Sequence, residues 1–144
     1  MNGVETAVSL FKEGSNCAQA LLSTYGVKLG LEREKSLKIA APFGGGMGRL
    51  GETCGAVIGA FMIIGLKYGT ATLKDQGAKD KTYDHTRDFV NRFKFRNGSI
   101  TCKNLLGCDI STPEGMKLAK DQNLINTLCP KFVHDAAEII EQIL

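Results

Sequence analysis

Residues 53–68, TCGAVIGAFMIIGLKY, contain the longest apolar stretch of the chain and decide its fold class. From Ala56 to Leu66 no polar residue interrupts the run, so a helix here is apolar on every face. Such a helix needs neighbours on all sides, and the run is too short to span a bilayer. The segment therefore predicts the central and most buried helix of a helical bundle, ending at Gly69.

The segments on either side of this run show helical spacing of apolar residues and no sustained alternation typical of strands. Glycine and proline mark most of the expected ends. The predicted helices cover a first segment ending at Gly14, residues 17–26, residues 32–41, the central 53–68, a charged helix from about residue 82 to Gly98, a short turn at 102–106, a helix starting at Thr112, and residues 130–142. The expected fold is all-α, a single domain over residues 1–144 that forms a compact bundle around the central helix.

Composition and charge exclude several classes of protein. Hydrophobic content of 43% and charged content of 23% are ordinary for a globular protein. The net charge of +3 is small and its basic residues are spread along the chain, so neither nucleic acid nor a membrane is an expected partner. The first residues lack the basic region of a secretory signal, which predicts a cytoplasmic location. Structural disulfides are rare in that compartment, so the five cysteines need another explanation.

Four of the five cysteines lie at predicted helix starts. A helix start favours negative charge through its free N–H groups and dipole, which predicts lowered pKa values for cysteines there. Thiolates are the form that metal binding, cluster ligation and thiol–disulfide exchange require. Cys108 differs, because it follows Gly107 in a loop. The four cysteines at predicted helix starts are Cys17 after Asn16, Cys54 after Thr53, Cys102 after Thr101, and Cys129 before Pro130.

The spacing of these cysteines leaves their meaning open. No C-x-x-C pair occurs, which argues against a zinc finger and against a thioredoxin-like motif. Dispersed cysteines form one site only if the fold brings them together. The alternative is that they are small buried hydrophobic residues, as free cysteines often are.

A glycine-rich loop precedes the central helix. Gly46, Gly48 and Gly51 match the G-x-G-x-x-G spacing of dinucleotide-binding loops, but no predicted strand precedes them and no acidic residue follows about 20 positions on. We therefore expect no binding of NAD, FAD or ATP. The favoured interpretation is that glycines let the backbone pack close to sulfur and donate N–H groups to a cofactor, although loop flexibility and helix packing explain them equally well. The candidate cofactor-binding residues are Gly44, Gly45, Gly46, Gly48 and Gly55.

The segment Cys54-Gly-Ala-Val-Ile-Gly59 resembles the CGAxxG motif of a family of redox-active proteins defined by four cysteines, written C_GCAxxG_C_C. The resemblance covers nearly the whole chain. It extends to the family features around the motif, which are Asn16-Cys-Ala-Gln19, Phe43-Gly-Gly-Gly-Met-Gly48, Gly65-Leu-Lys-Tyr-Gly69, Cys102 with Leu105-Leu-Gly107 and Asp109, and Cys129 before Phe132-Val133. Related four-cysteine domains occur in split-Soret-type cytochromes, where the domain resembles an iron–sulfur carrier.

The resemblance implies that Cys17, Cys54, Cys102 and Cys129 form one redox site and ligate any metal there. It favours an iron–sulfur centre of the 2Fe–2S type that transfers electrons, and a preparation made in air can lack it. The alternatives are a metal-free thiol–disulfide oxidoreductase or redox sensor and, more distantly, a structural zinc domain. Covalent haem is not expected because no C-x-x-C-H occurs. The sequence leaves open the redox partner protein, enzymatic activity, a homodimer, and the roles of Cys108 and His134.

Overall fold

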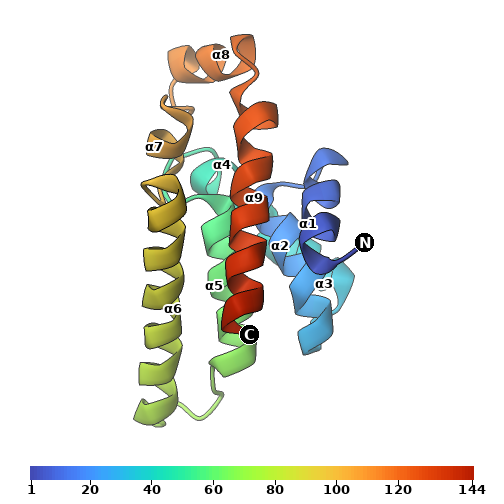
Figure 1. The fold of residues 1–144 in the computed structure, drawn as a ribbon, viewed down its shortest axis with the longest axis vertical. Coiled ribbons are helices and arrows are strands. Elements are labelled where there is room, and N and C mark those ends of the chain that lie inside the picture. The colour runs from blue at the N-terminus through green and yellow to red at the C-terminus, as the bar shows by residue number, and fades with distance from the viewer.

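The computed structural model describes residues 1–144, and its regular structure is helical (Figure 1). This confirms the all-α prediction. The one strand-like pairing is an isolated bridge between Thr53 and Thr101. In chain order the elements are α1 (Gly3–Lys12), α2 (Cys17–Gly26), the 3₁₀ turn η1 (Val27–Leu29), α3 (Arg33–Ala40), the 3₁₀ turn η2 (Ala41–Phe43), α4 (Gly44–Met47), α5 (Gly55–Tyr68), α6 (Gln76–Asn97), α7 (Cys102–Leu106), α8 (Pro113–Asp121) and α9 (Leu124–Ile143).

Helix α5 is the central helix that the apolar run predicts. It packs against α2, α6 and α9, and Figure 1 shows α9 beside it and α6 along its other side. Its C-terminal turn emerges from the bundle, where Leu66 is 40% exposed. The prediction that α5 is the most buried helix is wrong, because nine of the ten residues of α2 are buried between α1, α3, α5 and α9. Neither α5 nor any longer helix combines the length and hydropathy that a bilayer-spanning segment requires.

The buried apolar residues form two clusters of unequal size. The larger fills the space between α1, α2, α5, α6 and α9, and includes Cys17 and Cys54. The smaller lies under α7 and α8, at one end of the bundle in Figure 1, and includes Cys102. Cys129 packs against both clusters. The four cysteines therefore lie where the two clusters meet.

The charged helix α6 begins six residues earlier than its apolar spacing predicts. Its first residue is Gln76, and the side chain of Asp75 accepts a hydrogen bond from the Ala78 N–H at 3.0 Å. Residues 76–81 carry no apolar face, so periodicity gave no signal for this first stretch. The N-cap at Asp75 is the feature that marks the true start.

The close contact of α5 with α2 depends on Gly59. A β-carbon placed at Gly59 would lie 2.8 Å from Leu21 Cβ and 3.1 Å from the Ala18 carbonyl oxygen. We expect Gly59→Ala to lower the free energy of unfolding by about 1–3 kcal/mol, because this overpacking outweighs the gain in helix propensity. Gly65→Ala in the same helix is the control. Nothing lies within 4 Å of its β-carbon, and the change should raise stability by about 0.5–1 kcal/mol.

Urea unfolding of the two variants measures this difference directly. Equal stability changes for Gly59→Ala and Gly65→Ala would contradict a tight contact between α2 and α5.

Candidate functional site

Cys17 is the first residue of α2, and a capping box fixes it there. The Asn16 side chain accepts a hydrogen bond from the Gln19 N–H at 2.8 Å, and the Gln19 side chain accepts one from the Asn16 N–H at 2.9 Å. The Asn16 amide also donates to the carbonyl of Ala41 at 3.1 Å. The Asn-Cys-Ala-Gln sequence thus ties the start of α2 to the segment that leads into the glycine-rich loop.

A two-residue antiparallel pairing places Cys54 and Cys102 on adjacent segments. The Cys54 N–H donates to the carbonyl of Ile100 at 2.8 Å, and the Cys102 N–H donates to the carbonyl of Glu52 at 2.6 Å. Cys54 is the N-cap of α5, and Cys102 is the first residue of α7. The pairing explains how two cysteines that are far apart in the sequence come to lie beside each other.

Cys129 does not lie at a helix start, which corrects the sequence-based expectation. Helix α9 begins at Leu124, and Pro130 lies inside it. Proline there removes the backbone hydrogen bond to the carbonyl of residue 126, and its ring crowds the same carbonyl. The helix continues because Leu124 and Ile125 pack against the smaller apolar cluster. Cys129 therefore projects from the middle of a helix, just before the proline.

All four of these cysteines line one pocket of about 590 Å³, here called the cysteine pocket. Cys17, Cys54 and Cys102 are buried, and Cys129 is half-buried. Cys108 is also half-buried but is not among the lining residues. The structure thus brings together the four cysteines singled out from the sequence and leaves the fifth apart.

The four pocket cysteines lie close enough to affect one another's pKa values. Cys17 and Cys129 shift each other's pKa values most directly. The pKa of Cys54 is affected by the backbone N–H groups of Ala56 and Val57 at the start of α5 and by the Cys129 sulfur. The pKa of Cys102 is affected by the sulfurs of Cys54 and Cys129.

Burial reverses the pKa lowering that helix starts were expected to produce. Desolvation raises the pKa of Cys54 to about 11, against the opposing effect of the two N–H groups at its helix start. Desolvation and the neighbouring sulfurs raise the pKa of Cys102 to about 12. The hydrogen bond with Cys129, followed by burial, raises the pKa of Cys17.

Cys129 is the exception among the four cysteines. Its pKa is lowered by the hydrogen bond from Cys17, although burial acts in the opposite direction. The cysteine with the most thiolate character is thus the one outside a helix start, and a neighbouring thiol, not a helix dipole, is responsible.

The candidate glycines all line the cysteine pocket, and at two of them a β-carbon would lie within 3.0 Å of backbone atoms. Gly46 has φ +68°, and a β-carbon there would lie 2.6 Å from Cys102 Cβ and 2.8 Å from the Glu52 nitrogen. Gly55 has ordinary helical geometry, but its β-carbon would lie 2.8 Å from the Phe43 carbonyl oxygen and 3.3 Å from Cys17 Cβ. The candidate glycines on the lining are Gly44, Gly45, Gly46, Gly48 and Gly55.

The backbone of this loop is not that of a dinucleotide-binding turn. Residues 45–49 all have positive φ, so the chain makes a left-handed turn that includes the non-glycine residues Met47 and Arg49. The element before the loop is η2, where a dinucleotide-binding fold would have a strand. The expectation of no NAD, FAD or ATP binding remains a prediction.

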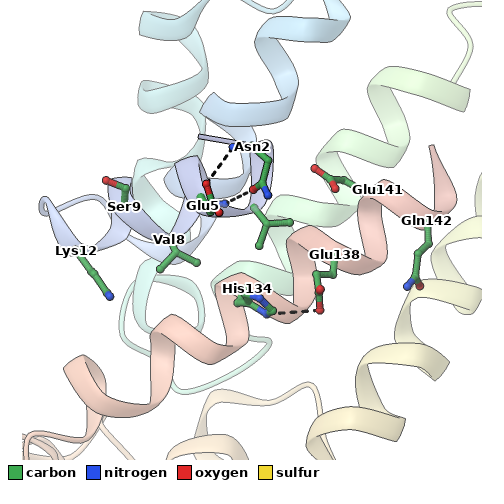
Figure 2. A pocket seen from close by; sticks show the side chains of 10 residues that line it. Asn2, Glu5, Val8, Ser9, Lys12, His134, Glu138, Glu141 and Gln142 are labelled. Carbon is green, nitrogen blue, oxygen red and sulfur yellow. Dashed lines mark hydrogen bonds and ion pairs between the residues drawn. The ribbon is translucent and has the colours of Figure 1, made fainter.

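His134 lies in a different pocket, shown in Figure 2. This pocket, between α1 and the C-terminal half of α9, has a volume of about 730 Å³ and is not lined by any cysteine. The His134 Nδ1 atom lies 3.4 Å from Asp135 Oδ1 and 3.6 Å from Glu138 Oε1. Arg96 pairs with both of these carboxylates, at 3.3 and 2.7 Å, and Lys131 pairs with Asp135 at 2.6 Å. His134 is therefore no candidate ligand for the cysteine pocket.

Sequence reasoning missed Lys120 and the role of Asn16. Lys120 lines the cysteine pocket from α8, and nothing in its local sequence distinguishes it from other exposed lysines. Asn16 carried a readable signal, because Asn and Gln three residues apart before an apolar run indicate a capping box.

Comparisons with known proteins give one match. No curated protein and no solved structure matches the chain. A family model matches residues 15–143, a range that includes all four pocket cysteines and the glycine-rich loop. The chain therefore belongs to the family described as "Putative redox-active protein (C_GCAxxG_C_C)".

Proposed function

We propose that the protein carries an electron-transfer centre of the 2Fe–2S type, held by Cys17, Cys54, Cys102 and Cys129. The single observation that carries this proposal is the gathering of four thiol groups around one pocket whose lining contains no histidine and no carboxylate. Four thiolates are the usual ligand set of such a cluster. The donors and the room available therefore fit the group.

The spacing of the sulfurs favours a centre with two metal atoms over a single zinc. Among the cysteine, histidine and acidic side chains, the three whose ligand atoms lie within 4.8 Å of one another are His134, Asp135 and Glu138, so no three sulfurs come this close. A single tetrahedral zinc with bonds of about 2.3 Å would hold its sulfurs closer, at about 3.8 Å. Two irons held by two thiolates each allow the four sulfurs to lie further apart.

The residues of the chain would tune such a centre through hydrogen bonding and burial. When bound, the cluster would accept and return one electron. The N–H groups of Ala56 and Val57 stabilise negative charge on the Cys54 sulfur, which would raise the reduction potential of a bound cluster. The apolar clusters on both sides leave three of the four cysteines buried.

A second function is favoured by the nearness of Cys17 and Cys129, which shift each other's pKa values. Two thiols in contact can form a reversible disulfide, giving two electrons and two protons to an acceptor disulfide that leaves as two thiols. Cys129 is the natural attacking group, since it has the lower pKa and is the more accessible of the two.

Anaerobic purification followed by iron, sulfide and zinc analysis distinguishes these functions. A brown protein with about two irons and two sulfides per chain supports the cluster. A colourless protein that reversibly loses two thiols on mild oxidation, with Cys17 joined to Cys129 by peptide mapping, supports disulfide chemistry. One zinc per chain, or five thiols indifferent to oxidation, would contradict both.

A further inference from the structure

The cysteine pocket carries an unbalanced positive charge. Of its 24 lining residues, Arg49 and Lys120 are the only charged ones, and no aspartate or glutamate is present. Neither cation forms an ion pair with any carboxylate of the chain. By contrast, Lys103 nearby is paired with Glu52 and Asp109, at 3.6 and 3.8 Å. Two unpaired cations on one pocket create a local field that attracts anions.

The fold holds one of these cations at the pocket at a conformational cost. Arg49 has φ +63°, which an ordinary L-residue adopts only with strain of about 1–3 kcal/mol. Its aliphatic stem lies over Gly45, where a β-carbon would come within 2.8 Å of Arg49 Cγ. The left-handed turn of residues 45–49 thus fixes the arginine stem against the glycine-rich loop. The guanidinium remains exposed, together with the ammonium of Lys120.

The second pocket shows that this charge is particular to the cysteine pocket. Glu5, Glu138 and Glu141 contribute carboxylates to the pocket of Figure 2, against one lysine and one histidine. An anion entering from solution is therefore drawn to the cysteine pocket and repelled from the other.

The size of the cysteine pocket determines the kind of anion. A volume of about 590 Å³ falls in the range of sites for small organic molecules, about 300–1,000 Å³. The lining combines thiols and apolar side chains such as Ile110 and Met116 with the two cations. We infer that Arg49 and Lys120 form an anion-binding subsite of this pocket, which takes a small carboxylate-bearing thiol or its disulfide. The choice of a sulfur-bearing ligand rests on the second proposed function, thiol–disulfide exchange, whereas the anion preference does not.

Alkylation by two reagents that differ in charge tests the anion preference. All five thiols are first reduced. Iodoacetate then transfers a carboxymethyl group, and iodoacetamide a carbamidomethyl group, to a thiolate sulfur with loss of iodide. Only iodoacetate is an anion. The quantity measured is the alkylation rate with iodoacetate divided by the rate with iodoacetamide at the pocket cysteines. Peptide mass spectrometry measures both rates. We expect Arg49→Gln together with Lys120→Gln to lower this ratio about tenfold at low salt.

The matched control is Lys35→Gln together with Lys74→Gln. This control also removes two positive charges, but from exposed positions that do not line the pocket, so it should leave the ratio unchanged. The inference is overturned if the two double variants give the same ratio. Circular dichroism and melting temperature establish that both are folded.

Oxidised glutathione and cystamine, an anionic and a cationic disulfide, test the ligand class. The native protein should exchange faster with glutathione disulfide, and the Arg49/Lys120 double variant should lose this preference. If the iodoacetate ratio falls while the glutathione preference does not, the assignment to carboxylate-bearing disulfides is wrong. These measurements are made on reduced protein from which any metal has been removed, so the proposed cluster and the anion subsite can fail separately.

Discussion

Replacing Cys54 with serine is expected to remove at least about nine-tenths of the iron and sulfide that the native protein carries after anaerobic purification. Cys54 is the N-cap of α5, and the fifth cysteine, Cys108, does not line the pocket, so no spare thiol lies there to take its place. A serine oxygen at this position is a harder and far less acidic ligand than a thiol. Iron and sulfide analysis with visible absorption measures the loss.

Cys108→Ser is the matched control, because it makes the same atomic change at a half-buried cysteine outside the cysteine pocket. It should retain the metal content and thiol behaviour of the native protein. If the centre is instead a disulfide, Cys17→Ser and Cys129→Ser should abolish reversible oxidation while Cys54→Ser leaves it intact. Loss of function in Cys108→Ser with retention in all four pocket variants would contradict the site itself.

The fold could be predicted from the sequence mainly where apolar periodicity and end signals coincide. The apolar run of α5 and the Gly98 end of α6 are clear in the sequence and agree with the structure. The starts of α6 and α9 could not be predicted from the sequence, for opposite reasons. Residues 76–81 have no apolar face, whereas Pro130 is a strong start signal that tertiary packing of Leu124 and Ile125 overrides.

The sequence was sufficient to predict which cysteines form the site, but not their pKa values. Cap residues and family spacing single out the four cysteines, yet their pKa values follow burial and mutual contact, which local sequence does not show. Cys17 on α2 and Cys129 on α9 come near each other only in the folded chain. Lys120 enters the pocket in the same way, from α8.

The glycine-rich loop provides the second large expected effect. Gly46 and Gly48 have nearly the same backbone conformation, with φ +68° and +63°. A β-carbon at Gly46 would lie 2.6 Å from Cys102 Cβ and 2.9 Å from the Glu52 carbonyl oxygen, whereas the nearest atom at Gly48 is 3.7 Å away. Alanine at either position should cost about 1–2 kcal/mol for the left-handed conformation.

Gly46→Ala should lower the free energy of unfolding by about 1–3 kcal/mol more than Gly48→Ala, since only the first must also push apart Cys102 and Glu52. The hydrogen bond from the Cys102 N–H to the Glu52 carbonyl positions Cys102. Moving these two residues apart should therefore also reduce the iron content or thiol reactivity of the cysteine pocket. Gly48→Ala should leave the iron content and the thiol reactivity unchanged. Urea unfolding and metal analysis of the two variants measure the effects independently. Equal destabilisation with equal loss of the site would mean that the left-handed turn, not the contact between Gly46 and Cys102, positions the cysteine.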